Sequence, residues 1–162
     1  MKKLSKIFFT IALLFCVSFS LCACKEKTTK ITINYLTFEK INSYTLNYDG
    51  AAGAGAVVSK SVFKINTEVH DGIMLKYEDF MFTNENGTPH NILSIEIYSQ
   101  YNVYTHVLPT TILNKDSLEN FKLLPNKTIF IEIKCVSGTL DGKHKLSYLS
   151  TVIDEINIIF NV

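Results

Sequence analysis

From residue 31 to the end of the chain, apolar side chains recur at every second position in short runs. The alternation is clearest in six segments, residues 31–35, 44–48, 73–77, 93–97, 129–135 and 156–162. A strand with one buried face produces this pattern, because successive side chains point to opposite faces of a sheet. β-Branched and aromatic residues, which favour strands, are frequent in the same segments. The pattern predicts a fold built from strands.

Residue pairs typical of tight turns separate these runs. They are Asp49-Gly50, Asp71-Gly72, Asn86-Gly87, Ser137-Gly138 and Asp141-Gly142. Asn-Gly and Asp-Gly supply the positive φ angles that hairpin turns require. Short strands separated by such turns are typical of a β-sandwich. We expect one all-β domain over residues 31–162, an Ig-like antiparallel β-sandwich of about seven or eight strands.

One segment, residues 114–124, favours a short helix. Asp116 or Ser117 is a suitable N-cap, and Pro125 would end the helix. The apolar residues between them, Leu118, Phe121 and Leu124, have helical spacing. We expect at most this one short helix.

The first 23 residues follow a different pattern. Lys2, Lys3 and Lys6 precede a mostly apolar run over residues 7–21. A positively charged start followed by an apolar run is typical of a secretory signal peptide. The run is short for a membrane-spanning helix, which needs about 20 apolar residues. We therefore expect residues 1–23 to be a signal peptide.

This signal ends in Leu21-Cys22-Ala23-Cys24, which resembles the lipobox of bacterial lipoprotein precursors. Leu21 matches the branched aliphatic position, Cys22 stands at the small-residue position, and Ala23 precedes the obligatory cysteine. The resemblance implies cleavage after Ala23 and a diacylglyceryl thioether on Cys24. Residues 24–30 would then be a lipidated tether that holds the domain to the extracytoplasmic face of a membrane. An ordinary cleaved signal and an uncleaved anchor are the alternatives.

Composition restricts the partners of the mature domain. All 16 basic residues are lysine, and three of them lie in the signal, so its removal changes the formal net charge from +1 to −2. A nearly neutral domain lacks the excess positive charge that binds nucleic acid. Without arginine, the chain also lacks the bidentate guanidinium that recognises phosphate.

Cysteine usage predicts a single free thiol in the mature protein. Cys16 and Cys22 leave with the signal, and Cys24 carries the lipid, so only Cys135 remains. Alternation places Cys135 on the same face as the isoleucines of segment 129–133. A buried cysteine behaves as a small apolar residue. We expect an inert core thiol rather than a nucleophile or redox site.

The glycine-rich segment 48–57 indicates a structural role rather than nucleotide binding. It lacks the Gly-Lys-Ser/Thr of a P-loop and the third glycine of a dinucleotide fingerprint. The segment instead resembles the start of an Ig-like module found in surface proteins and lipoproteins of low-GC bacteria. The matching residues are Tyr44, Leu46, Tyr48, Gly50, Gly53 and Gly55, whereas Ala52 replaces the usual Asp or Asn. The resemblance covers residues 31–70 and implies a sandwich with an outward-facing role and no catalytic residue.

Candidate catalytic and metal-ligating residues are dispersed along the sequence. The four histidines, at positions 70, 90, 106 and 144, show no ligand spacing, and no familiar hydrolase or metalloprotease motif is present. Glu78-Asp79 and Asp154-Glu155 are adjacent acidic pairs that we expect in solvated turns. We therefore predict no catalytic residues, no metal and no cofactor.

Tyrosines are the last candidate for binding. Tyr98, Tyr101 and Tyr104 lie in one extended run, in which alternation puts Tyr98 and Tyr104 on one face and Tyr101 on the other. Exposed tyrosines bind sugars or protein partners, whereas packing at the core and sheet edge is the alternative. Tyr98 and Tyr104 are the candidate ligand-binding residues.

These features predict a membrane-anchored lipoprotein whose extracytoplasmic domain binds a protein or an envelope glycan without catalysis. Two alternatives stay open. One is a hydrolase of cell-envelope or host glycans, with carboxylates brought together from distant strands. The other is a structural lipoprotein of envelope assembly.

Overall fold

The computed structural model describes residues 29–48, 56–102, 107–116, 120–136 and 142–158. These residues form eleven strands and one 3₁₀ turn, Tyr77–Asp79. The strands are β1 (Lys30–Ile33), β2 (Leu36–Tyr48), β3 (Ala56–Thr67), β4 (Ile73–Leu75), β5 (Phe80–Asn84), β6 (Pro89–Tyr98), β7 (Thr111–Leu113), β8 (Phe121–Leu123), β9 (Thr128–Val136), β10 (Gly142–Tyr148) and β11 (Thr151–Ile158).

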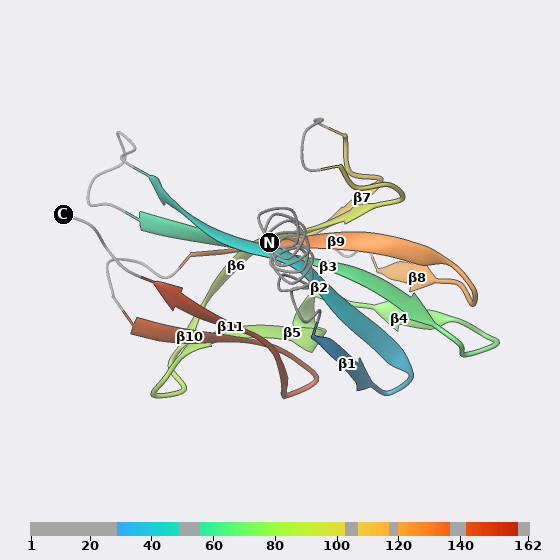
Figure 1. Cartoon of the computed structure of the whole chain (residues 1–162), viewed down its shortest axis with the longest axis horizontal. Coiled ribbons are helices and arrows are strands. Elements are labelled where there is room, and N and C mark those ends of the chain that lie inside the picture. Colours follow the sequence, from blue (N-terminus) through green and yellow to red (C-terminus); the bar gives the residue numbers. More distant parts are fainter. Residues whose placement is uncertain (1–28, 49–55, 103–106, 117–119, 137–141, 159–162) are drawn as a thin grey trace, which may run out of the picture.

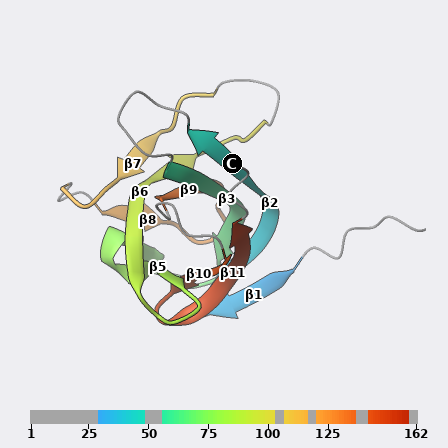
Figure 2. The same ribbon diagram turned by 90° about the vertical axis from the view of Figure 1, so that its left-hand side faces the viewer.

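Nine of these strands form one antiparallel sheet. Its order is β1-β2-β3-β9-β6-β5-β10-β11, with β7 paired to β6, and β4 and β8 form a separate two-stranded sheet (Figure 1). The large sheet curls until β11 contacts β2 and β3, so that it is nearly closed (Figure 2). The predicted all-β, sandwich-like antiparallel fold is confirmed. The strand number exceeds the expected seven or eight, in part because the three-residue strands β7 and β8 are too short to give an alternating pattern.

The inner face of the curled sheet holds the hydrophobic core. On β9 the inward side chains are those of the predicted run, Ile129, Ile131, Ile133 and Cys135, and all four are buried. At the end of the sheet near β1, the ring of Phe38 lies against Phe63, Phe80 and Tyr148, at centroid distances of 5.9, 6.4 and 5.1 Å. Burial of each such side chain stabilises the fold by about 1.5–3 kcal/mol.

Tight turns of two kinds connect the strands. Asp71-Gly72 and Asn86-Gly87 form turns as predicted, with φ of +75° at Gly72 and +79° at Gly87. Two further hairpin turns contain no glycine. Asn34 and Tyr35 adopt φ of 45° and 65° between β1 and β2, and residues 149–150 adopt 45° and 66° between β10 and β11. The first strand therefore ends at Ile33 rather than at Tyr35.

The helix expected over residues 114–124 is wrong in its second half. Residues 121–123 form β8, which pairs with β4 so that Leu123 opposes Ile73. Phe121 and Leu123 pack inward on either side of exposed Lys122, so tertiary pairing overrides the helical spacing. The N-terminal candidates, including Cys24, lie outside the described residues. Within the described residues, no helix has the length and apolar character needed to cross a membrane.

Candidate functional site

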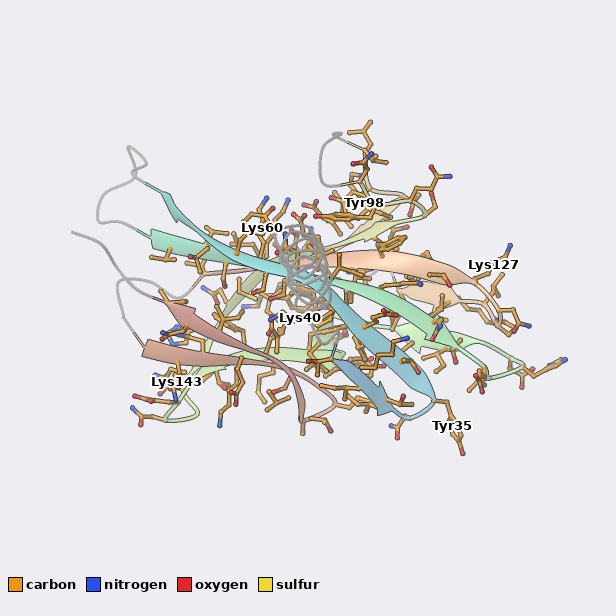
Figure 3. The ribbon with its side chains drawn as sticks, in the orientation of Figure 1. Tyr35, Lys40, Lys60, Tyr98, Lys127 and Lys143 are labelled. Atoms are coloured by element: carbon orange, nitrogen blue, oxygen red, sulfur yellow. The ribbon has the colours of Figure 1, made fainter. Side chains whose placement is uncertain are left out.

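A groove of about 330 Å³ crosses the outer face of the sheet over β2, β3, β9 and β6. Charged side chains form its floor, and tyrosines and a short apolar segment form its walls. We call it the tyrosine–lysine groove, and define it by Lys60, Glu96, Glu132, Lys134, Tyr44, Tyr98, Tyr101 and residues 107–109. Lys60 and Tyr98 lie on this outer face, whereas Lys40 lies on the inner side towards β11 (Figure 3).

Strand register places like charges opposite each other on the floor. Lys60 on β3 is the direct partner of Lys134 on β9, and Glu132 on β9 is the direct partner of Glu96 on β6. The inward positions between them, Ile133 among them, are part of the core. Like charges at opposed positions repel each other. The charged floor is therefore stabilised by contacts between diagonal neighbours on adjacent strands or between residues of the same strand.

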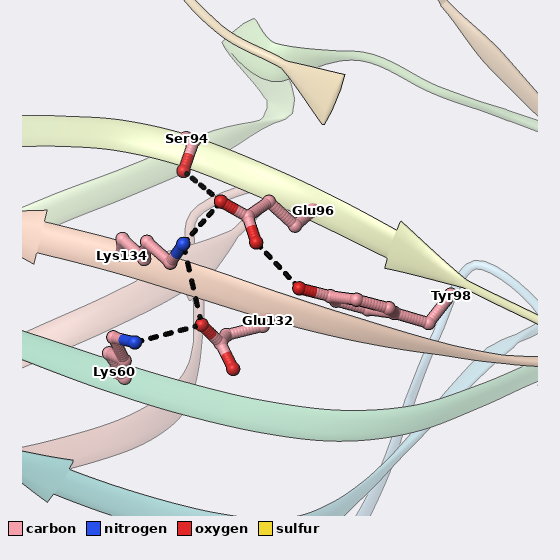
Figure 4. A network of polar contacts seen from close by, with 6 residues as sticks. All are labelled: Lys60, Ser94, Glu96, Tyr98, Glu132 and Lys134. Atoms are coloured by element: carbon pink, nitrogen blue, oxygen red, sulfur yellow. Dashed lines mark hydrogen bonds and ion pairs between the residues drawn. The ribbon is translucent and has the colours of Figure 1, made fainter. Parts of the chain in front are cut away.

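Lys134 makes two of these contacts. Its ammonium bonds to Oε1 of Glu96 and lies 3.6 Å from Oε1 of Glu132 (Figure 4). The Lys60 ammonium lies 3.3 Å from the same Glu132 oxygen. Two lysines and two glutamates thus form one continuous network, in which each charge contacts at least one opposite charge.

Two hydroxyl groups also donate hydrogen bonds to Glu96. The Tyr98 hydroxyl donates to Oε2 at 2.6 Å, and the Ser94 hydroxyl donates to Oε1 at 3.3 Å. Burial alone would raise the pKa of Glu96, but hydrogen bonds from Lys134 and Tyr98 and the charge of Lys134 outweigh it and lower the pKa. Glu96 is therefore an ionised acceptor at neutral pH. Burial, with the hydrogen bond and charge of Glu96, raises the pKa of Tyr98.

Tyr101 and Tyr44 form the aromatic walls. The ring of Tyr101 stacks against Phe130 at a centroid distance of 6.0 Å and meets Tyr98 edge-on at 5.9 Å. Burial, followed by the charge of Glu132, raises the pKa of Tyr101 to about 12. The Lys60 ammonium lies 5.6 Å from the centre of the Tyr44 ring. Desolvation would lower the pKa of Lys60, but attraction to Glu132 and Tyr44 outweighs it and raises the pKa, so Lys60 is charged at neutral pH.

One of the two predicted binding tyrosines lies in the groove. Tyr98 lines it but is only 7% exposed, so it supports Glu96 more than it offers a free ring face. Tyr104 lies outside the described residues. The expectation that Tyr101 faces away from Tyr98 is wrong, because β6 ends at Tyr98 and alternation stops with the strand.

The charged floor is not evident from the sequence alone. One signal was present, since Glu132 and Lys134 occupy the outward positions of a strand whose other positions are apolar. Alternation alone therefore places these two on a common face. It does not reveal that Lys60 and Glu96 lie beside them, because that depends on the pairing of β9 with β3 and β6.

The remaining candidates lie elsewhere. Cys135 is buried in the core as predicted, and burial, with the nearby charge of Asp154, raises its pKa. The expectation of a solvated turn at residues 154–155 is wrong: both lie in β11, where Asp154 faces inward and accepts a hydrogen bond from Ser61 at 2.7 Å. Glu78 and Asp79 lie in the 3₁₀ turn, with Glu78 exposed.

Two histidines that are distant in sequence come together between β6 and β10. The ring centroids of His90 and His144 are 5.2 Å apart. His144 is buried, and its Nδ1 lies 3.2 Å from the carbonyl oxygen of Gly142. In the described part of the chain, no group of three or more His, Cys, Asp or Glu residues is arranged to hold a metal ion.

Comparison with protein-family models, with curated proteins and with solved structures found no match.

Proposed function

We propose that this protein is a lipid-anchored, extracytoplasmic binding module that acts without catalysis and presents the tyrosine–lysine groove to an envelope ligand. The signal and lipobox at residues 1–24 support the anchor. The groove supports the binding role, because it combines apolar walls with a few fixed polar groups, as small-ligand sites do.

A single observation favours binding over hydrolysis. The groove brings two carboxylates, Glu96 and Glu132, to opposed strand positions, which is the kind of pair that glycoside hydrolysis requires. Such a reaction also requires one carboxyl group that is protonated near neutral pH and acts as a general acid. Lys134 contacts both carboxylates, and the pKa of Glu96 is lowered rather than raised. Glu96 is therefore suited to accepting hydrogen bonds rather than to donating a proton.

The anchor is tested by expressing the full chain in a bacterium that processes lipoproteins. We expect the mature N-terminus to be an acylated Cys24, detected by mass spectrometry, with the protein in the membrane fraction. Cys24→Ser should abolish the added acyl mass, and Cys22→Ser is the matched control that should retain it. An unmodified Cys24 in the wild-type protein would overturn the proposal.

Catalysis is tested on the same purified protein. Incubation with envelope glycans should release no new reducing ends, and Glu96→Gln and Glu132→Gln should leave that result unchanged. Glycan cleavage that either substitution abolishes would favour the hydrolase instead.

A further inference from the structure

The charge balance of the tyrosine–lysine groove indicates which ligands it can accept. We infer that the groove binds an uncharged, hydroxyl-rich ligand, namely a neutral saccharide unit. This inference rests on the proposed binding function and specifies the ligand class for the same site.

A charged ligand would disturb the ion pairs of the groove floor. The floor contains two lysines and two glutamates, and each ammonium already contacts a carboxylate. An anionic ligand would compete with Glu96 or Glu132 for these ammonium groups, and a cationic ligand would compete with the lysines. Separating a partly buried pair leaves a charge without its partner and is costly. A neutral ligand leaves every pair intact.

The network also leaves hydrogen-bonding capacity for a ligand. A carboxylate accepts about four hydrogen bonds, and an ammonium donates three. Glu96 accepts from Ser94, Tyr98 and Lys134, and Lys134 contacts two carboxylates. Counting contacts among the described residues, one acceptor site on Glu96 and one donor on Lys134 remain, on side chains that are 13% and 25% exposed.

Hydroxyl groups match this remaining capacity. A hydroxyl donates one hydrogen bond and accepts others, so it can accept from a lysine and donate to the adjacent glutamate. Neighbouring hydroxyls of a sugar ring can do so at successive ion pairs of the floor. Amines at neutral pH only donate, and carboxylates and phosphates only accept, so neither satisfies both partners.

The walls of the groove suit the rest of a sugar ring. Tyr44 and Tyr101 present aromatic surface, and Val107, Leu108 and Pro109 present aliphatic surface, with Leu108 86% exposed. The C–H faces of a sugar ring pack on such surfaces. The volume of about 330 Å³ lies at the lower end of the range of about 300–1,000 Å³ for small-ligand sites. It therefore fits a short saccharide segment.

The strand arrangement argues against an extended peptide in the same groove. Peptides that bind to sheets commonly pair with a free strand edge. The strands that carry the charged floor, β3, β9 and β6, each pair with a neighbour on both sides there. Recognition at this site therefore comes from side chains.

The test is calorimetric titration of the mature, detergent-solubilised lipoprotein. The probes are neutral disaccharides of hexose and of N-acetylhexosamine, a disaccharide containing a uronic acid, and an uncharged extended peptide. We expect the neutral disaccharides to bind most tightly. Tyr101→Ala and Glu96→Gln should each weaken that binding about tenfold, whereas Tyr101→Phe, which keeps the ring, should weaken it less. Tyr35→Ala removes an exposed tyrosine far from the groove and should have no effect.

Three results would overturn the inference. The first is no heat of binding with any neutral disaccharide at tens of millimolar. The second is binding that Tyr101→Ala and Glu96→Gln leave unchanged in variants that unfold at the wild-type temperature. The third is tighter binding of the uronic acid or peptide probe, lost in the same two variants. That third result would leave the proposed binding module standing, and acylation of Cys24 reports on the anchor independently.

Discussion

The ammonium of Lys40 on β2 bonds to the carboxylate of Asp154 on β11, across the line where the curled sheet comes back on itself. Among the described strands, β11 pairs with β10 and contacts β2 and β3 without a hydrogen-bonded ladder. The Asp154 side chain is 2% exposed and also accepts the Ser61 hydroxyl of β3. Side chains rather than backbone pairing therefore hold this line together.

Replacement of Asp154 should weaken the fold more than a surface change does. In Asp154→Ala, Lys40 and Ser61 lose their common acceptor, and we expect a loss of about 3 kcal/mol in the free energy of unfolding. Glu155→Ala removes the adjacent exposed carboxylate, and its effect should be within about 0.5 kcal/mol. Urea unfolding followed by circular dichroism measures both. Equal losses in the two variants would show that the Lys40–Asp154 pair does not stabilise the closure.

Acid should destabilise the protein through His144 as the pH falls below about 6.5, the ordinary pKa of histidine. The ring is buried, stacks on Phe82 at 5.2 Å, and lies beside His90. Burial, together with the charge of His90, lowers its pKa, although the Gly142 carbonyl and Glu85 oppose the shift. The unfolded chain then binds the proton more readily than the folded chain, so stability is complete above this pH and decreases below it.

Substitution of His144 separates its titration from that of other groups. His144→Phe keeps an aromatic ring against Phe82, and should lose less stability than the wild type between about pH 7 and about pH 5.5. His70→Gln is the control, since the His70 side chain is fully exposed. Urea midpoints at both pH values measure the difference. An identical pH dependence in the wild type and His144→Phe would contradict the assignment.

The Cys135 thiol should be unreactive in the folded protein. It is 1% exposed, and burial raises its pKa, so little thiolate exists at neutral pH. Alkylation by iodoacetamide should modify Cys135 only after denaturant is added, and peptide mass mapping assigns the label to this residue. Rapid modification of the native mature protein would show that the thiol is accessible through opening of β9.

The sequence predicts the core more readily than the site, and β9 shows the reason. Alternation over residues 129–135 identifies the inward face of this strand, because burial on one side leaves a period of two. The same period places Glu132 and Lys134 outward. It cannot show that Glu96 is the direct partner of Glu132, because register depends on packing over the whole sheet.

Asp154 and the glycine-free turns show two further limits. Asp154 resembles a solvated turn residue because its neighbour is also acidic, yet its partners are on β2 and β3. Asn34 and Tyr35 adopt the two positive φ angles of a hairpin turn without glycine, so a search for Asn-Gly or Asp-Gly misses them. For Asp154, the deciding contacts come from strands that are distant in sequence. For the turn, they come from the pairing of β1 with β2, which the sequence alone does not show.

Two glycines with nearly equal backbone angles should respond differently to alanine. Both φ angles are positive, +75° at Gly72 and +79° at Gly87, so each substitution carries a conformational cost of about 1–2 kcal/mol. A Cβ at Gly72 would also lie 2.4 Å from the backbone oxygen of Leu123, whereas a Cβ at Gly87 would meet nothing within 4 Å among the described atoms. Because the obstacle is backbone, β8 must shift, and we expect Gly72→Ala to lose about 1–3 kcal/mol more than Gly87→Ala. Thermal unfolding of the two variants measures the difference, and equal losses would mean that β8 moves away from the turn at no cost.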